Sequence, residues 1–200
     1  MTSFAEALVL EGERVLLEPL TTRHVPGLAD AAADGCLWEL LYTGVPEPDD
    51  TVDYVQQALA MQVDGLAVPF VVRRAADGRV VGSTRYCNID AANRRLEIGY
   101  TWYAASAQRT AVNSECKLLL LQHAFETLDC IAVEFRTHWL NQRSRAAIAR
   151  LGAKQDGVLR NHRILPDGSL RDTVVFSILA SEWPAVKQLL RTRLARGHEA

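Results

Sequence analysis

The sequence predicts a mixed α/β sheet with helices packed on it. Antiparallel hairpins are expected early and late in the chain, with one strand–helix–strand–helix unit between them. The 200 residues, 48% of them hydrophobic and 23% charged, suit a single domain that spans residues 1–200. The irregular order of elements argues against a doubly wound parallel sheet and against a (β/α) barrel, in which strands and helices alternate throughout.

The first half of the chain is expected to contain three strands and two helices. Thr21 or Thr22 can cap the first helix, and the segment GVPEPDD at 44–50 separates it from the second. An ADGR turn at 76–79 joins two of the strands into a hairpin. The expected strands lie at 14–20, 68–74 and 80–88, and the expected helices run to about Asp34 and over about 52–63.

The middle of the chain is expected to contain a strand at 95–103 and a helix at 116–128. The helix is predicted because apolar residues recur every three or four positions, and Asn113 or Ser114 can cap it. Glu97 is the only acid of the strand, whose side chains alternate. One face carries Leu96, Ile98, Tyr100 and Trp102, and the other carries Glu97, Gly99, Thr101 and Tyr103.

The last part of the chain is expected to contain three strands and two helices. Asn141 can open the first helix, and Gly152 can end it. The expected ranges are strands at 131–139, 157–165 and 172–180 and helices at 144–151 and about 182–195. The strand at 131–139 places Val133, Phe135, Thr137 and Trp139 on one face and Glu134, Arg136 and His138 on the other.

Composition and charge argue against several kinds of protein. A formal net charge of −2 is unlike that of a general nucleic-acid binder. We expect no membrane span, because no apolar run is long enough, and no secretory signal in the acidic start MTSFAEALVLEGE. The four cysteines lie far apart without metal-ligand spacing, so we expect buried thiols, no metal and a cytoplasmic location.

A polar loop joins the strand at 95–103 to the helix that follows it. Its residues are Gln108, Arg109, Thr110, Ala111, Val112 and Asn113. The amino terminus of a helix presents unpaired N–H groups and a positive dipole end, which favour a bound phosphate, and Arg109 can add a charged donor. The alternative is a turn that binds nothing, because a phosphate loop usually has glycine at positions such as 111 and 113.

Several segments occur in an order that matches a known family. They are EIGYTW at 97–102, QRTAVN at 108–113, SECKLLLLQHAFE at 114–126, NQRS at 141–144 and RLGA at 150–153. With the early RVLLEPL and Arg171-Asp172, this order resembles the Gcn5-related N-acetyltransferases (GNAT), in particular the RimJ/RimL-like branch. The resemblance covers nearly the whole chain. In the family pattern Gln/Arg-x-x-Gly-x-Gly/Ala, Gln108 is the first residue, and Ala111 and Asn113 replace the last two small residues.

The resemblance implies a central, mostly antiparallel twisted sheet, splayed between two parallel strands and flanked by helices. It also implies that acetyl-CoA binds as a co-substrate, with its pantetheine arm between the strands at 97–103 and 131–139, beside the backbone of Trp102 and Tyr103. Its pyrophosphate would lie on residues 108–113. Asn141 would bond the pantetheine or the amine, although from the residues alone it is equally a helix cap.

The reaction implied by the resemblance is direct attack of a neutral amine on the acetyl thioester. This chemistry needs a base for the ammonium proton and an acid for the departing thiolate. Glu97 is the first candidate for the base, with Glu134 and His138 in reserve, and an ordinary strand glutamate is the alternative for Glu97. Ser144, by resemblance near the thioester sulfur, is the candidate acid.

The predicted function is transfer of an acetyl group from acetyl-CoA to a primary amine, either a protein or peptide amino terminus or a small molecule. The alternatives are a non-catalytic acyl-CoA-binding or regulatory protein on the same fold, and a purely structural protein that does not bind CoA. The substitutions at Ala111 and Asn113 motivate the first alternative. A homodimer is possible, but no residue pattern decides it.

Overall fold

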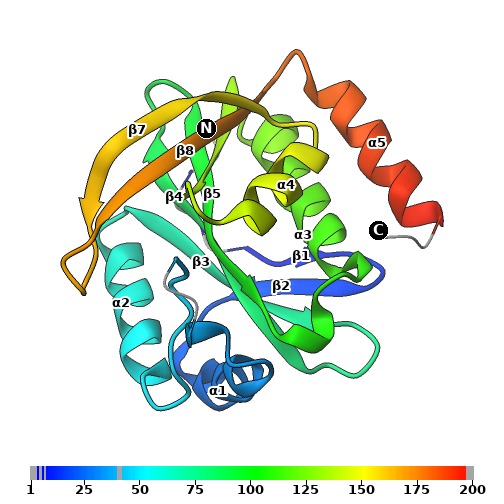
Figure 1. Cartoon of the computed structure of the whole chain (residues 1–200). Helices are drawn as coiled ribbons and strands as arrows, with labels where there is room; N and C mark the ends of the chain where they lie inside the picture. The colour runs from blue at the N-terminus through cyan, green and yellow to red at the C-terminus, as the bar shows by residue number, and fades with distance from the viewer. Residues whose placement is uncertain (1–3, 5, 7, 40–41, 197–200) are drawn as a thin grey trace.

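The computed structural model describes residues 4, 6, 8–39 and 42–196. Within them, eight strands form one twisted sheet in the order β1-β2-β3-β4-β5-β6-β8-β7 (Figure 1). The strands are β1 (Leu10–Glu11), β2 (Val15–Pro19), β3 (Ala67–Arg74), β4 (Val80–Asp90), β5 (Arg95–Tyr103), β6 (Ala132–His138), β7 (Lys154–Ile164) and β8 (Leu170–Leu179). The α-helices are α1 (Val25–Ala33), α2 (Thr51–Val63), α3 (Ala111–Gln122), α4 (Gln142–Arg150) and α5 (Trp183–Arg196). Shorter helical turns lie at Thr22–His24, Leu37–Glu39, Ala105–Ala107 and His123–Thr127.

Neighbouring strands in the described sheet are antiparallel except for β5 and β6, which run parallel. The predicted mixed sheet, mostly antiparallel and splayed between two parallel strands, is therefore confirmed. The predicted early and late hairpins correspond to β3–β4 and β7–β8. The short strand β1, which pairs with β2, was not predicted, because two residues are too few to show a pattern.

Helix α3 begins at Ala111 and not at Cys116, so the predicted start is wrong. Thr110 is the N-cap, and its hydroxyl accepts a hydrogen bond from the Val112 N–H at 3.3 Å. The predicted caps, Asn113 and Ser114, lie in the first turn of the helix. The loop before the helix is therefore shorter than the sequence suggested.

Strand β6 ends at His138, so the prediction that Trp139 continues the strand face of Val133, Phe135 and Thr137 is wrong. The Trp139 side chain is 41% exposed, and its ring packs under the Arg145 guanidinium at 4.2 Å from the ring centre. The other predicted members of that face, Val133, Phe135 and Thr137, are buried. The chain leaves the strand at Trp139 and turns toward α4. The Trp139 ring therefore packs against Arg145 of that helix and not in the core.

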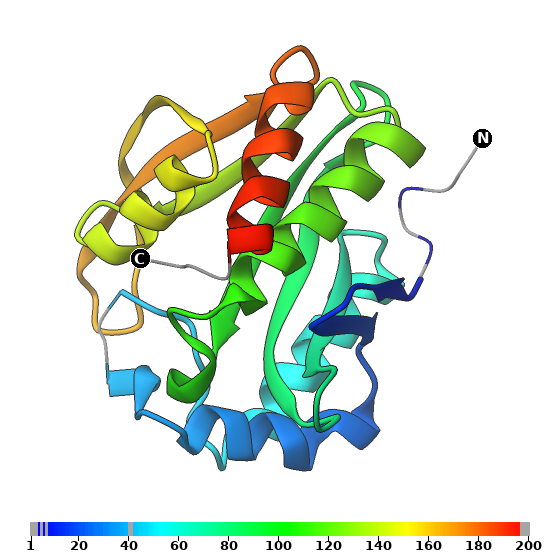
Figure 2. The same cartoon turned by 90° about the vertical axis from the view of Figure 1, so that its right-hand side faces the viewer.

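Helices cover both faces of the sheet (Figures 1 and 2). Helices α1 and α2 pack on one face around a cluster that includes Leu28 and Val55. Helices α3, α4 and α5 pack on the other face around a larger cluster that includes Leu120, Ile148 and Leu190, and α5 lies along α3. We refer to these as the α1/α2 face and the α3 face. No helix in the described residues is long and apolar enough to cross a membrane.

Strand β5 contains a β-bulge, in which Tyr100 and Thr101 together oppose Thr84 of β4. Tyr100 adopts a positive φ of +51° and is 43% exposed. The extra residue reverses the alternation of side chains, because Ile98 packs in the α3-face cluster whereas Trp102 packs in the α1/α2-face cluster. The prediction that these side chains share one face along the whole strand is therefore wrong beyond the bulge.

Glu115 of α3 ties the helix to the turn between β1 and β2. Its carboxylate accepts hydrogen bonds from three backbone N–H groups, those of Glu13 at 3.2 Å, Arg14 at 2.7 Å and Val15 at 2.8 Å. The residue is only 5% exposed, so these donors have little access to water. The clamp holds the first half of α3, and the loop that precedes it, in place against the sheet.

Replacing Glu115 by Gln is expected to lower the free energy of unfolding by about 2–4 kcal/mol, because an amide NH₂ would face backbone donors that then lack an acceptor. Urea unfolding at equilibrium measures this change. Glu13→Gln is the matched control, since the Glu13 side chain is 85% exposed. It is expected to change the free energy by less than about 0.5 kcal/mol. Equal effects of the two substitutions would contradict the clamp.

Candidate functional site

The parallel strands β5 and β6 are paired along only part of their length. Their register joins Arg95 with Ala132, Leu96 with Val133 and Glu97 with Glu134, and it stops there. Beyond this point β5 passes through its bulge alongside β4, while β6 continues alongside β8 to His138. The strands therefore part as the resemblance implied, with Glu97 at the fork.

Glu97 lies on the α1/α2 face and is only 6% exposed. Its Oε2 accepts a hydrogen bond from Asn88 Nδ2 at 2.6 Å and lies 3.4 Å from Arg136 Nε. Burial raises the pKa of Glu97, whereas the Asn88 hydrogen bond and the Arg136 charge oppose that rise. Burial thus makes this carboxylate a better proton acceptor than a surface glutamate, and its two partners fix its orientation.

The two reserve candidates for the base are less suited by their contacts. Glu134 is held by Arg95 Nη2 at 2.5 Å and by Arg136 Nη2 at 3.0 Å. The Nδ1 atom of His138 accepts the backbone N–H of Leu140 at 3.0 Å, so its neutral ring carries the proton on Nε2. Burial and the Arg171 charge lower the pKa of His138, with Asp172 opposing. The free nitrogen of His138 is therefore a hydrogen-bond donor.

The loop between β5 and α3 is held against the end of the strand. Gln108 Nε2 donates to the Tyr103 carbonyl at 3.0 Å, and the Thr110 hydroxyl donates to the Ala107 carbonyl at 2.6 Å. Helix geometry leaves the N–H groups of Ala111 and Asn113 without a backbone acceptor, because both lie in the first turn. Together with the helix dipole, these donors can hold an anion.

Ala111 and Asn113, which replace the small residues of the family pattern, do not strain the backbone. Ala111 lies in the first helical turn and is not among the residues with positive φ. Arg109 does adopt a positive φ, of +58°, and its side chain is exposed beside the helix amino terminus. Val112 is buried in the α3-face cluster and anchors the loop. The loop is therefore anchored in the core through Val112, while Arg109 and the first N–H groups of α3 remain available as donors.

Trp102 and Tyr103 lie on opposite faces of β5. Trp102 Nε1 donates to the Tyr54 hydroxyl at 3.1 Å on the α1/α2 face, and Tyr103 packs in the α3-face cluster. Their backbones pair with β4, where a side chain on Gly82 would place a Cβ atom 2.2 Å from the Trp102 carbonyl oxygen. The other edge of β5, which pairs with β6 as far as Glu97, has no paired strand among the described residues beyond that point.

Asn141 and Ser144 lie together just after the end of β6. Asn141 Oδ1 accepts the Ser144 backbone N–H at 2.9 Å, which makes Asn141 the N-cap of α4. Ser144 is half-buried in the first turn. No hydrogen bond within the described residues joins Ser144 to Glu97. The structure thus bears out the helix-cap interpretation of Asn141, whose Nδ2 is not used in the cap.

Lys117 of α3 is a buried lysine close to the bulge of β5, and its burial was not predicted from the sequence. It is buried, and its Nζ donates to the Thr101 hydroxyl in the bulge at 2.8 Å. The same hydroxyl lies 2.8 Å from that of Thr84. Burial lowers the pKa of Lys117 to about 8. The sequence does contain a signal for this burial, because Lys117 lies directly before four leucines in the predicted helix.

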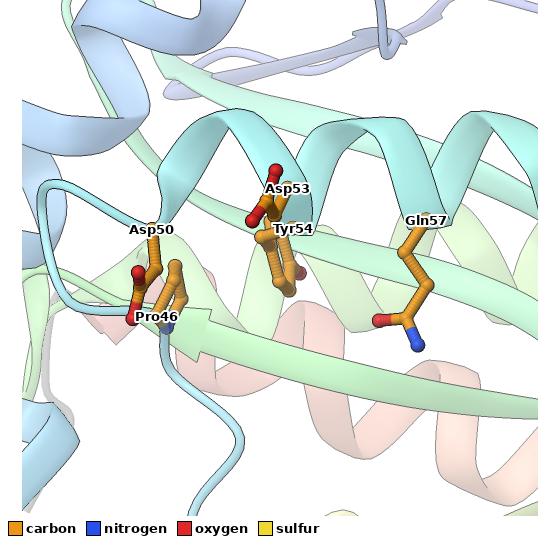
Figure 3. Close-up of a pocket in the computed structure, with 5 residues that line it drawn as sticks. All are labelled: Pro46, Asp50, Asp53, Tyr54 and Gln57. Atoms are coloured by element: carbon orange, nitrogen blue, oxygen red, sulfur yellow. The ribbon is translucent and has the colours of Figure 1, made fainter.

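A pocket of about 550 Å³ lies at the start of α2 (Figure 3). Tyr54, which lines it, also accepts the hydrogen bond from Trp102 and so connects the pocket with β5. The pocket is lined by Pro46, Asp50, Asp53, Tyr54 and Gln57.

The cysteines form no disulfide, and three of them are buried. The prediction that the thiols are buried is wrong for Cys36, which is exposed. Burial raises the pKa of the Cys116 and Cys130 thiols to about 12, so both stay protonated. The described residues contain no group of three His, Cys, Asp or Glu side chains arranged to hold a metal ion.

The chain matches an established family and a curated relative. The family described as an acetyltransferase (GNAT) domain matches residues 14–154. A protein of Bacillus subtilis (strain 168), provisionally named ribosomal N-acetyltransferase YdaF, is 32% identical over 111 residues. This match covers 56% of the present chain and 60% of YdaF, so the chain spans less than two thirds of that relative.

Solved structures share the fold over nearly the whole chain. A crystal structure from T. thermophilus, provisionally described as an acetyltransferase, is 34% identical, with a TM-score of 0.84 and coverage of 97% of this chain and 100% of that one. RimJ of Mycobacterium smegmatis, solved in complex with CoA-disulfide, has a TM-score of 0.78 with 97% of both chains covered. At 22% identity, the likeness to RimJ concerns the fold alone.

The buried Lys117 is expected to make stability depend on pH. Its folded-state pKa of about 8 lies below the value of an unfolded lysine, so between pH 8 and about 10.5 only the unfolded chain holds this proton. Lys117 therefore contributes a rise of about 3 kcal/mol to the free energy of unfolding across this window. The raised pKa values of the Cys116 and Cys130 thiols oppose it, because the unfolded thiols lose their protons first. Urea unfolding at several pH values between 7 and 10 measures the rise.

Lys117→Met is expected to remove this rise and to be more stable than the parent near pH 7. Lys154→Met is the matched control, because the Lys154 side chain is 77% exposed and ion-paired with Glu182. That variant is expected to keep the rise. The same pH dependence in the parent and in Lys117→Met would contradict a buried ammonium.

Proposed function

The chain belongs to the GNAT family of acetyltransferases, and on that premise we propose that it transfers an acetyl group from acetyl-CoA to a primary amine, by direct attack within a ternary complex. One observation carries the proposal: β5 and β6 part beside a buried carboxylate, Glu97, and β5 then leads to the amino terminus of α3, whose N–H groups can hold an anion. The sheet thus combines a place for an extended acyl carrier with a proton acceptor. The chain is proposed to act as a single domain, since its strands share one sheet.

In this proposal acetyl-CoA lies along β5. Its diphosphate binds the N–H groups of Ala111 and Asn113, with Arg109 as a charged donor. Gln108, Thr110 and Val112 support this site by holding the loop in place. The pantetheine arm lies between the parted strands, beside the backbone of Trp102 and Tyr103.

The amine nitrogen attacks the thioester carbonyl carbon, and the C–S bond then breaks. Glu97 accepts the proton lost by the nitrogen, directly or through a water molecule, for which its raised pKa suits it. Ser144 is proposed to lie near the sulfur, where its hydroxyl donates a hydrogen bond to the departing thiolate and relays to it a proton taken up from solvent water. Asn141 contributes its unused Nδ2 donor to the pantetheine or to the amine.

The proposed acceptor is a protein or peptide amino terminus or a small-molecule amine. The relative YdaF is provisionally named a ribosomal N-acetyltransferase, which supports an acceptor of the first kind. A cytoplasmic site of action is proposed, since four free thiols suit a reducing compartment. The anion site at the start of α3 is assigned to acetyl-CoA and not to nucleic acid, because the chain carries a net charge of −2.

Calorimetry with acetyl-CoA tests the cofactor site. We expect micromolar affinity, about −8 kcal/mol, weakened about tenfold by Arg109→Ala and by Ala111→Pro. Proline is tolerated at the first position of a helix and removes only the N–H that the proposal assigns to the diphosphate. Arg79→Ala, which removes an exposed arginine from the β3–β4 turn, is the matched control. Undiminished affinity in both loop variants would place the cofactor elsewhere.

Amine-dependent release of the CoA thiol tests the reaction. Glu97→Gln is expected to slow turnover by about 10²–10⁴ without changing acetyl-CoA affinity, because only proton transfer is lost. Binding of acetyl-CoA without thiol release, across a broad panel of amines, would instead support a non-catalytic acyl-CoA-binding protein. An unchanged rate in Glu97→Gln would show that this carboxylate is not the base.

Gly99→Ala tests the position of the same carboxylate. A Cβ atom there would lie 2.8 Å from Glu97 Oε1 and 2.9 Å from Cys87 Sγ, so the carboxylate must move. We expect turnover to fall by about tenfold, since small misplacements of reacting groups are costly. Gly157→Ala is the control, because no atom lies within 4 Å of its Cβ position.

A further inference from the structure

The α1/α2 face carries polar side chains where the helices do not cover it. Helix α1 packs over β4 and α2 over β3, whereas β6, β8 and β7 lie beyond them. Three arginines on this face have no carboxylate within ion-pair distance among the described residues. These are Arg85 of β4, Arg163 of β7 and Arg171 of β8, which we call the arginine trio.

Arg85 is fully buried and lacks acceptors for two of its nitrogen atoms. Its guanidinium lies between two aromatic rings, at 4.8 Å from the centre of Tyr54 and 4.3 Å from that of Tyr100. Nη1 contacts Met61 Sδ at 3.4 Å, while Nε and Nη2 have no partner. A buried guanidinium without an acceptor is unfavourable, so this position favours an anion that supplies one.

Arg163 and Arg171 lie directly opposite each other in the β7–β8 hairpin. Like charges in such a pair destabilise a hairpin unless an anion lies between them. Arg171 Nε donates to the Thr173 hydroxyl at 3.0 Å, and burial and the Arg163 charge lower the pKa of Arg171. The Glu97 charge opposes this effect, so Arg171 lies close to the fork between the strands.

The acids nearest the trio already have partners. Glu97 is held by Asn88 and Arg136, and Glu134 is held by Arg95 and Arg136. Asp172 is engaged by Arg160. The positive charge of the trio is therefore not used within the described part of the chain.

We infer that the acceptor is an amine that also carries a carboxylate, which the arginine trio binds while the amine faces Glu97. The inference rests on the proposed acetyl transfer and names the class of its acceptor. The planar fork of guanidinium matches a carboxylate with two parallel hydrogen bonds. A carboxylate from an acidic residue near a peptide amino terminus, or from a free amino acid, offers the same chemistry, whereas polyamines do not.

The trio also favours the reactive form of the acceptor. Nearby positive charge lowers the pKa of an ammonium group, so more of the bound amine is neutral and able to attack. The proton that leaves the nitrogen passes to Glu97, which lies on the same face.

Two peptides of equal length test the inference, one with Asp at its second to fourth positions and one with Asn there. An aminocarboxylic acid and its amide form a second pair, which distinguishes a peptide source of the carboxylate from a free amino acid. We expect kcat/KM to be about tenfold higher for the acidic member of at least one pair. The preference is expected to fall to near unity in the double variant Arg163→Gln/Arg171→Gln, because the contacts to the acceptor carboxylate are lost.

Arg79→Gln/Arg150→Gln is the matched control, because it also removes two positive charges, from exposed side chains, and it is expected to keep the preference. Binding of the same peptides to the CoA-loaded protein, measured by calorimetry, gives a readout that does not depend on turnover. Equal binding and equal kcat/KM for acidic and neutral acceptors would overturn the inference and leave the proposed function standing. Preferential binding of the acidic member without any acetylation would overturn the proposed function and, with it, the role of the trio in acceptor choice.

Discussion

The parting of β5 from β6 is the constraint on which the rest of the site depends. Parallel strands that stayed paired would satisfy each other's backbone groups and leave no room for a substrate. Pairing stops at Glu97 and Glu134, so one edge of β5 is free of a strand neighbour within the described residues beyond that point. The same break places a buried carboxylate at the fork and directs β5 toward the start of α3.

The bulge at Tyr100 and Thr101 links the two sides of this fork. On the α3 face, the Thr101 hydroxyl accepts a hydrogen bond from the buried Lys117 of α3, the helix whose amino terminus is the proposed anion site. On the α1/α2 face, Tyr100 covers the guanidinium of Arg85. A single extra residue in β5 thus positions groups of both proposed substrate sites, because it changes which face each later side chain occupies.

Local patterns in the sequence predicted most elements, because periodicity and caps depend on neighbouring residues. The cap at Asn141 and the paired hairpins follow from such signals. The bulge did not, since apolar residues at Ile98 and Trp102 fit a regular strand equally well. The Glu115 clamp joins residues about a hundred positions apart in the sequence, so no local pattern predicts it. The absence of hydrogen-bond acceptors for Arg85 Nε and Nη2 depends on how side chains pack around it, which no local pattern predicts either.

A crystal structure of the protein with acetyl-CoA would test the central claim most directly. The account predicts that the pantetheine arm lies between β5 and β6 beyond Glu97, with the diphosphate on the amide groups at the start of α3. It also predicts that the acetyl carbonyl carbon lies within reach of the Glu97 carboxylate through at most one water molecule. A thioester bound outside the fork, or a diphosphate away from residues 109–113, would contradict it.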